Sequence, residues 1–150
     1  AQMLAFSTSS SAATLPLTMK RVNKNLNVSE EVTSFVCPLG ATINMDGTSI
    51  HQAISAVFIA QAFGQDLTIA DQLVIIVTAT LSSIGAAAVP GAGLIMLVIV
   101  LEAVGIDPQG LALIIAIDRP LDMLRTMVNV TSDTVGTAII AKSENHELYN

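Results

Sequence analysis

The chain has 150 residues, of which 52% are hydrophobic and only 12% are charged, and its mean hydropathy is +0.68. A soluble domain normally has about a quarter of its residues charged, so this composition favours a membrane protein. The net charge of −6, with six scattered basic residues, argues against binding to nucleic acid. The single cysteine, Cys37, cannot form a disulfide within the chain.

The N-terminal segment leads into a run of hydroxyl side chains. It begins Ala1-Gln2-Met3 and has neither the basic region nor the long apolar stretch of a signal peptide. We therefore expect the chain to start inside a structure whose preceding helices are missing. Residues 7–11 read Ser-Thr-Ser-Ser-Ser and offer hydroxyl and backbone N–H groups that suit a carboxylate. A flexible serine-rich linker is the alternative.

A polar break interrupts the next helical pattern at residues 40–48, which read Gly-Ala-Thr-Ile-Asn-Met-Asp-Gly-Thr. The carbonyl, amide and carboxylate oxygens of such a break suit a small hard cation. Asp-Gly alone more often marks a surface turn, so that interpretation also stays open.

The apolar segments are shorter than a membrane span. They cover roughly residues 50–63, 73–81, 94–106 and 111–117, whereas a single spanning helix needs about 20 apolar residues. Short segments broken by small residues indicate re-entrant hairpins or unwound helices. The breaks at residues 11–16 and 85–90 both end in a branched aliphatic residue and proline, which indicates either an internal repeat or a chance similarity.

The last helical segment carries a stripe of polar side chains. Their spacing of three or four residues places them within one face roughly 80° wide. A solvated face is one interpretation, but the apolar flanks favour an internal cavity, because charges at membrane depth need partners. Arg125 suits a carboxylate and Asp122 an ammonium, which together fit an acidic amino acid. The stripe consists of Asp118, Asp122, Arg125, Asn129 and Asp133.

Over nearly its whole length the chain resembles the dicarboxylate/amino acid:cation symporter family, which contains glutamate and archaeal aspartate transporters. The motifs are Asn-Met-Asp-Gly-Thr at residues 44–48, Ser-Ile-Gly at 83–85 with Val-Pro-Gly-Ala-Gly at 89–93, and Asp-Met-Leu-Arg-Thr-Met-Val-Asn-Val at 122–130. The resemblance implies an all-α membrane protein with two re-entrant helical hairpins, one unwound and one polar-striped transmembrane helix, forming part of an elevator transport domain. It implies hairpin 1 at residues 1–24, helix 7 at 30–63, hairpin 2 at 70–106, helix 8 at 111–142 and a tail at 143–150.

The same resemblance implies a substrate site and sodium sites. The implied substrate-binding residues are Ser11, Thr48, Val89, Gly93, Asp122, Arg125, Thr126 and Asn129. One sodium site would use Gly40, Asn44, Asn129 and Asp133, a second would use mainly carbonyls of Thr42, Met45, Ser83, Ile84 and Ala86, and a third would involve Asn44 and Asp46. No organic cofactor is implied, because sodium is a co-transported ligand.

The implied function is sodium-coupled symport of aspartate or glutamate by an elevator mechanism, with no enzyme activity. Gln52 stands where animal glutamate transporters have a glutamate linked to proton and potassium coupling, so we expect no potassium counter-transport. A proton-coupled C4-dicarboxylate symporter and a transport-incompetent fragment are the alternatives. A serine hydrolase using Ser9–Ser11, His51 and Asp46 is disfavoured, because no Gly-x-Ser-x-Gly elbow is present.

The expected partners are the acidic substrate, sodium, a lipid bilayer and, at full length, further copies in a homotrimer, without nucleic acid. Basic residues follow hairpin 1 and helix 8, whereas acidic residues flank hairpin 2. Because basic residues favour the cytoplasmic side, this distribution indicates that hairpin 1 and the C-terminus lie in the cytoplasm and the base of hairpin 2 outside. We expect a multi-pass protein of a bacterial or archaeal plasma membrane. The basic residues are Lys20, Arg21, Lys24 and Lys142.

Overall fold

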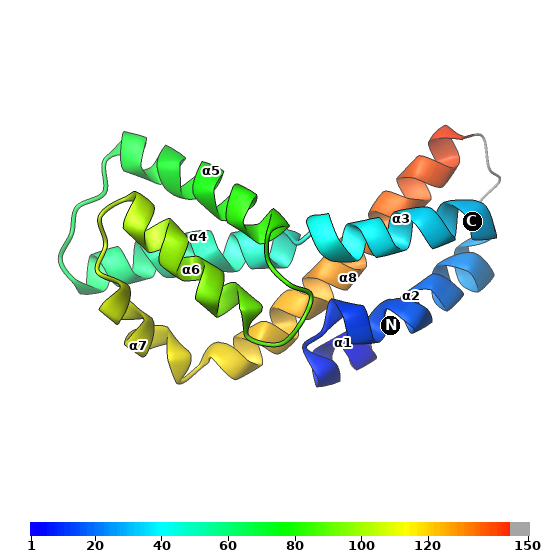
Figure 1. Ribbon diagram of the computed structural model, residues 1–150, viewed down its shortest axis with the longest axis horizontal. Coiled ribbons are helices and arrows are strands. Elements are labelled where there is room, and N and C mark those ends of the chain that lie inside the picture. Colours follow the sequence, from blue (N-terminus) through cyan, green and yellow to red (C-terminus); the bar gives the residue numbers. More distant parts are fainter. Residues whose placement is uncertain (145–150) are drawn as a thin grey trace.

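The computed structural model describes residues 1–144, and all regular secondary structure in that range is helical (Figure 1). The all-α prediction is therefore confirmed. The helices are α1 (Gln2–Thr8), α2 (Ser11–Leu26), α3 (Glu30–Ile43), α4 (Asp46–Ala62), α5 (Ile69–Ile84), α6 (Ala92–Ala103), α7 (Leu111–Ile115) and α8 (Asp118–Ser143), with a 3-10 turn at Pro108–Gly110. Residues 145–150 of the expected tail lie outside the described part.

Hydroxyl side chains fix the starts of several helices. Ser10 Oγ accepts a hydrogen bond from the Ala13 N–H at 3.1 Å and begins α2. Thr68 begins α5, where its hydroxyl accepts from the Asp71 N–H at 3.2 Å and the Asp71 carboxylate accepts from the Thr68 N–H at 2.9 Å. Because these side chains satisfy N–H groups that have no partner inside the helix, each helix begins at that point.

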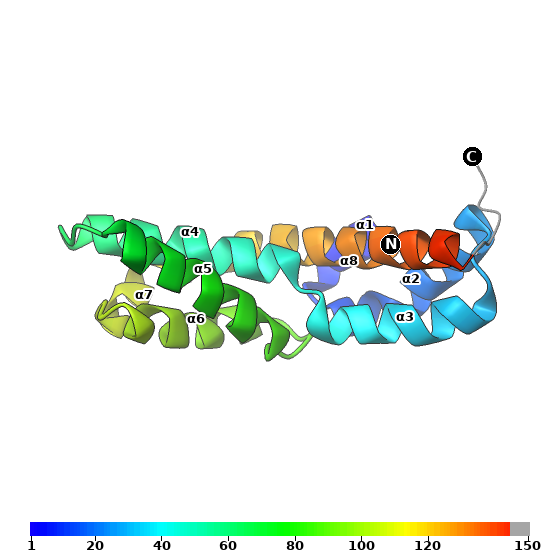
Figure 2. The ribbon, with the colours of Figure 1, turned by 90° about the horizontal axis from the view of Figure 1, so that it is seen from above.

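Two helix pairs, α1 with α2 and α5 with α6, pack around the central helices α3, α4 and α8. The segments expected as hairpins 1 and 2 contain α1 with α2 and α5 with α6, and the segment expected as helix 7 contains α3 and α4. Figures 1 and 2 show α3 and α4 running roughly end to end, with α8 alongside both of them. The loop between α5 and α6 reaches back toward α1 and α2, so the tips of both pairs meet near the middle of the molecule.

Two backbone breaks shape this arrangement. Asn44 and Met45 have φ, ψ angles of −104°, 66° and −102°, 60°, which separate α3 from α4. Ala116 and Ile117 separate α7 from α8, because Pro120 has no N–H and its ring clashes with the carbonyl four residues earlier. The segment 111–142, expected as one helix, therefore contains two.

The apolar core is divided into two clusters with polar residues between them. The larger cluster joins α4, α5, α6 and α7, with Ile59, Ile75 and Leu97 fully buried at its centre. The smaller one joins α2, α3 and α8 around Val22 and Cys37. Burial of such side chains contributes about 1.5–3 kcal/mol each, so the two clusters hold the ends of the molecule and leave its middle available for polar groups.

The stripe of α8 points inward. Its members are at most 9% exposed, which excludes the solvated-face interpretation. The outer surface is unusually apolar by contrast, with Met3, Phe35, Ile69 and Ile95 each more than 70% exposed. No helix among the described residues is both long and apolar enough to cross a membrane.

Candidate functional site

One small cavity lies where the tips of both helix pairs meet α4 and α8. Its lining includes every residue implied as substrate-binding: Ser11, Thr48, Val89, Gly93, Asp122, Arg125, Thr126 and Asn129. Its volume is about 20 Å³, close to the minimum of about 10–15 Å³ that one water molecule needs. An amino acid therefore needs this cavity to open before it can enter.

Arg125 is the buried cation of this cavity. Its Nη2 and Nε donate to Asp122 Oδ1 at 2.5 Å and 3.2 Å, and its Nη1 lies 3.1 Å from His51 Nδ1. Asp118 Oδ1 lies 4.0 Å from Nη2 and has no hydrogen-bond partner among the described residues. The guanidinium is thus held on two sides, by Asp122 and by His51.

Asp122 also holds the loop between α5 and α6. Its second oxygen, Oδ2, accepts from the Gly91 N–H at 2.9 Å. Gly91 has φ +79°, a left-handed conformation that glycine adopts without steric cost. The carboxylate that faces the guanidinium therefore also closes the loop over the cavity.

The two tips share one carbonyl. Ala88 O accepts from Ser10 Oγ at 2.8 Å and from the Ala12 N–H at 3.4 Å. The Ser9 hydroxyl is buried, and among the described residues it has no hydrogen-bond partner, although Ser9 lines the same cavity. A buried hydroxyl without a partner is costly, so Ser9 is available to a polar ligand.

Amide groups join α4 to α8 below the cavity. Asn129 Oδ1 accepts from the Gly47 N–H at 2.8 Å, and Asn129 Nδ2 lies 3.3 Å from Thr48 Oγ1. Thr126 donates its hydroxyl hydrogen to Asp122 O at 2.8 Å, so it faces the same side of α8. These contacts connect the broken segment of residues 44–48 to the polar stripe.

The residues implied for the first and third sodium sites meet at the break between α3 and α4. Asn44 Nδ2 donates to Asp133 Oδ1 at 3.1 Å and to Ser132 Oγ at 2.9 Å, and Ser132 Oγ donates to Asp46 Oδ2. A Cβ on Gly40 would lie 2.7 Å from Asp133 Oδ1, so glycine is needed for this close approach. Hard oxygens from a carboxylate, an amide and nearby carbonyls are ligands suited to a small cation.

The residues implied for the second sodium site are only partly together. Met45, Ser83 and Ile84 line a cavity of about 390 Å³ beside Asp46. Thr42 instead donates its exposed hydroxyl to the carbonyls of α3, at 2.8 Å from Pro38 O, and Ala86 lines the small cavity beside Arg125. Among residues 1–144 no group of at least three His, Cys, Asp or Glu side chains is placed to hold a metal ion.

Several contacts were not predicted from the sequence. His51 was considered only as an unlikely hydrolase base, yet it contacts Arg125. Gln52 is fully buried, where its Oε1 accepts from Ser82 Oγ at 2.6 Å and its Nε2 donates to Gly93 O at 3.3 Å. All these partners are distant in sequence, so no local spacing signals them.

Broken helices around a buried polar cavity, within a largely apolar exterior, are typical of secondary transport proteins. The model of the Sodium:dicarboxylate symporter family matches residues 1–143, and the chain belongs to this family. The family is one of transporters, which excludes the hydrolase alternative.

The chain is 51% identical over 148 residues to the excitatory amino acid transporter 3 of Mus musculus, covering 99% of this chain and 28% of that protein. It is 50% identical over 148 residues to the excitatory amino acid transporter 1 of Ambystoma tigrinum, covering 99% of this chain and 27% of that protein. It is 49% identical over 150 residues to the excitatory amino acid transporter 1 of Rattus norvegicus, covering 100% of this chain and 28% of that protein.

The chain therefore spans little more than a quarter of the length of the curated relatives that it matches. These relatives are animal proteins, so the expectation of a bacterial or archaeal membrane has no support from them.

Proposed function

We propose that this chain is the C-terminal, substrate-binding part of a longer sodium-coupled symporter for acidic amino acids. The observation that carries the proposal is the buried Arg125–Asp122 pair in a cavity lined by both helix tips. A buried ion pair is poor evidence of stabilisation, because desolvation offsets most of its attraction. It is better explained as a pair of receptors for opposite charges on one ligand.

Arg125 keeps donors free for such a ligand. One N–H each from Nε, Nη1 and Nη2 is used by Asp122 and His51, which leaves one N–H on each terminal nitrogen. Two parallel donors at the end of a guanidinium suit a carboxylate bidentately. The side-chain carboxylate of aspartate or glutamate would bind there, and Asp122 would exchange part of its contact with Arg125 for the substrate's ammonium.

Sodium would occupy the oxygen-rich break beside the substrate cavity. One ion would be held by Gly40, Asn44, Asn129 and Asp133. A second would be held mainly by carbonyls of Thr42, Met45, Ser83, Ile84 and Ala86, and a third by Asn44 and Asp46 with groups from the rest of the polypeptide. Gln52 supports coupling to sodium without potassium counter-transport, since its neutral amide, which contacts Ser82 and Gly93, carries no titratable group.

We also propose that this chain lies in the membrane, because its helices are broken and many of its exposed side chains are apolar. α1–α2 and α5–α6 would be re-entrant hairpins of an elevator transport domain in a multi-pass protein, and the exposed apolar side chains would face lipid and the rest of the polypeptide. Assembly of the full-length protein into a homotrimer is part of this proposal, as the family resemblance implies.

The proposal is tested by uptake of labelled L-aspartate into vesicles that contain the full-length protein. An inward sodium gradient is expected to drive accumulation that an equal choline gradient does not. The second candidate is a proton-coupled C4-dicarboxylate symporter, and the family's description supports its dicarboxylate substrate but names sodium as the coupled ion. Accumulation of labelled succinate under a proton gradient, with no effect of sodium, would establish that candidate instead.

Gly93→Ala is expected to weaken L-aspartate binding by about tenfold or more. The added methyl group would lie 2.7 Å from Arg125 Cζ, so the guanidinium must move and lose a charge-assisted hydrogen bond, and about 1.4 kcal/mol is a factor of ten. The measurement is the inhibition constant of L-aspartate on sodium-dependent uptake.

Gly136→Ala in α8 is the matched control, because its added methyl would meet nothing within 4 Å. It is expected to leave the L-aspartate inhibition constant unchanged. Unchanged affinity in Gly93→Ala as well would show that the position of the guanidinium does not matter for binding.

A further inference from the structure

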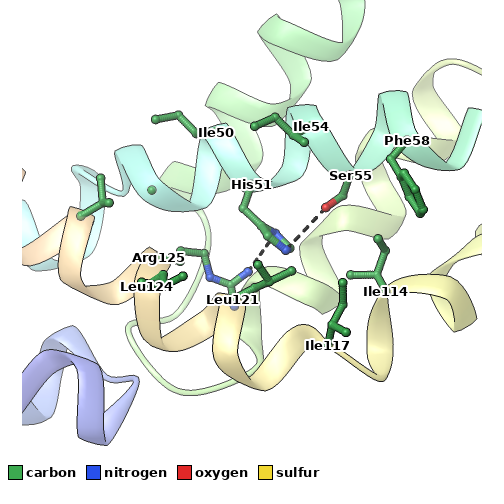
Figure 3. Close-up of a pocket in the computed structure, with 12 residues that line it drawn as sticks. Ile50, His51, Ile54, Ser55, Phe58, Ile114, Ile117, Leu121, Leu124 and Arg125 are labelled. Atoms are coloured by element: carbon green, nitrogen blue, oxygen red, sulfur yellow. Dashed lines mark hydrogen bonds between the residues drawn. The ribbon is translucent and has the colours of Figure 1, made fainter.

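His51 lies outside the substrate cavity but contacts its cation. Figure 3 shows the imidazole pointing from α4 toward α8, with Arg125 on one side and Ser55 on the other. Nδ1 lies 3.1 Å from Arg125 Nη1, and Nε2 lies 3.5 Å from Ser55 Oγ. The ring thus joins the guanidinium to a hydroxyl on its own helix.

The chemistry of the two partners fixes the state of the imidazole. A guanidinium only donates hydrogen bonds, so His51 Nδ1 must be an acceptor without a proton. The ring proton then sits on Nε2 and faces the Ser55 hydroxyl. His51 is therefore neutral when it holds Arg125, and its contact is a charge-assisted hydrogen bond.

Among the described residues, the cavity on the Nη1 side of Arg125 offers only the Ser55 hydroxyl as another acceptor. His51 and Arg125 lie at the polar edge of a cavity of about 360 Å³ between α4, α7 and α8. Apart from Ser55, the other side chains of its lining are apolar, among them Ile54, Phe58 and Ile114. Within residues 1–144 no other protein acceptor lies within hydrogen-bond distance of Nη1, and Asp118 Oδ1 lies 4.0 Å from Nη2. Replacing the lost hydrogen bond therefore requires a side chain to move, so in this apolar setting its contribution is large.

The two contacts of Arg125 act from opposite sides. Asp122 engages Nε and Nη2, whereas His51 engages Nη1. When a substrate's ammonium draws Asp122 away, His51 is the acceptor that remains within hydrogen-bond distance of the guanidinium, with Asp118 Oδ1 farther away at 4.0 Å. Its contact then decides whether the free N–H pair still points into the substrate cavity.

We propose that His51 is a positioning residue that fixes the Arg125 guanidinium and thereby sets the preference for an acidic over a neutral amino acid. The inference rests on the proposed function, because it assigns to Arg125 the side-chain carboxylate of the substrate. His51 does not line the small cavity proposed to hold the substrate, so its effect is expected to be confined to ligands that need the guanidinium.

The test compares His51→Leu with His51→Asn in the full-length protein. Leucine removes the acceptor, whereas the Asn Oδ1 is separated from Cα by the same number of bonds as the His Nδ1. The inhibition constants of L-aspartate and L-serine are measured on sodium-dependent uptake. His51→Leu is expected to weaken L-aspartate about tenfold and to leave L-serine unchanged, and His51→Asn is expected to recover most of the loss.

Two further variants keep the test decisive. Ile54→Ala trims the same cavity without touching an acceptor and is expected to keep the ratio of the two inhibition constants. If His51→Leu does not fold, His51→Gln serves in its place, since its amide reaches toward Ser55 rather than Arg125 and is expected to bind L-aspartate less well than His51→Asn.

The outcomes separate the two proposals. Parallel losses for L-aspartate and L-serine, or equal affinities in the Asn variant and in the Leu or Gln variant, would overturn the role of His51 and leave the proposed function standing. Absence of sodium-dependent L-aspartate uptake by the unsubstituted protein would overturn the proposed function, and the role of His51 with it.

Discussion

Replacing Arg125 by cysteine is expected to weaken L-aspartate binding by about a hundredfold and to let neutral amino acids compete on nearly equal terms. Truncating one partner of a buried, hydrogen-bonded charge pair costs about 2–5 kcal/mol, and about 2.8 kcal/mol is a factor of a hundred. The same change removes the guanidinium from Asp122, so that, in the described part of the chain, its carboxylate keeps only the hydrogen bond from the Gly91 N–H. The measurement is competition of L-aspartate and L-serine for sodium-dependent uptake.

Arg125→Lys is the control for charge, because lysine keeps the cation but has no planar fork. It is expected to retain more L-aspartate affinity than cysteine and less than arginine. L-aspartate affinity that survives in Arg125→Cys would remove the carboxylate role assigned to this side chain.

Replacing Asp133 by asparagine is expected to raise the sodium concentration for half-maximal binding by about ten- to a hundredfold. Even second-shell changes at metal sites cost that much, and Asp133 is proposed as a direct ligand. Because linkage is reciprocal, L-aspartate affinity at a fixed, limiting sodium concentration is expected to fall with it. Both quantities are obtained from sodium titrations of L-aspartate binding.

Asp71→Asn is the matched control for loss of a carboxylate. Asp71 belongs to the capping box at the start of α5, away from the polar break between α3 and α4. It is expected to leave the sodium titration unchanged. If Asp133→Asn also keeps the original sodium dependence, Asp133 is not a sodium ligand.

The polar stripe of α8 shows what local sequence can predict. Its spacing of three and four residues places Asp122, Arg125 and Asn129 on one face, and that face is buried in the structure. The interruption at Asn44 and Met45 was also predictable, since polar residues stood inside a helical pattern. Both features follow from periodicity along a single element.

The break before α8 had a signal that was not used. Pro120 follows the apolar run by a few residues, and proline in the first turn of a helix marks a start rather than an interior. The expectation of one helix over residues 111–142 came from the family resemblance, and the missing N–H of Pro120 was not weighed against it.

Contacts between elements could not be predicted in the same way. His51 and Arg125 are 74 positions apart, and their meeting depends on how α4 packs against α8. The Gly91 N–H reaches Asp122 only because the loop folds over the cavity. Thr42 and Ala86 were implied through their carbonyls, whose directions depend on backbone angles and not on side-chain type.

The shared carbonyl of Ala88 has a consequence for access to the cavity. The tips are joined there by the hydroxyl of Ser10 and the N–H of Ala12, and such hydrogen bonds stabilise a closed form by only about 0.5–1.5 kcal/mol each. A state that lies a few kcal/mol higher is populated at about 0.1–10% at equilibrium. The contact between the Gly91 N–H and Asp122 adds to the stability of this closed form. For the proposed symporter, we therefore expect thermal motion to open the cavity, so that the energy of the ion gradient would serve accumulation rather than entry.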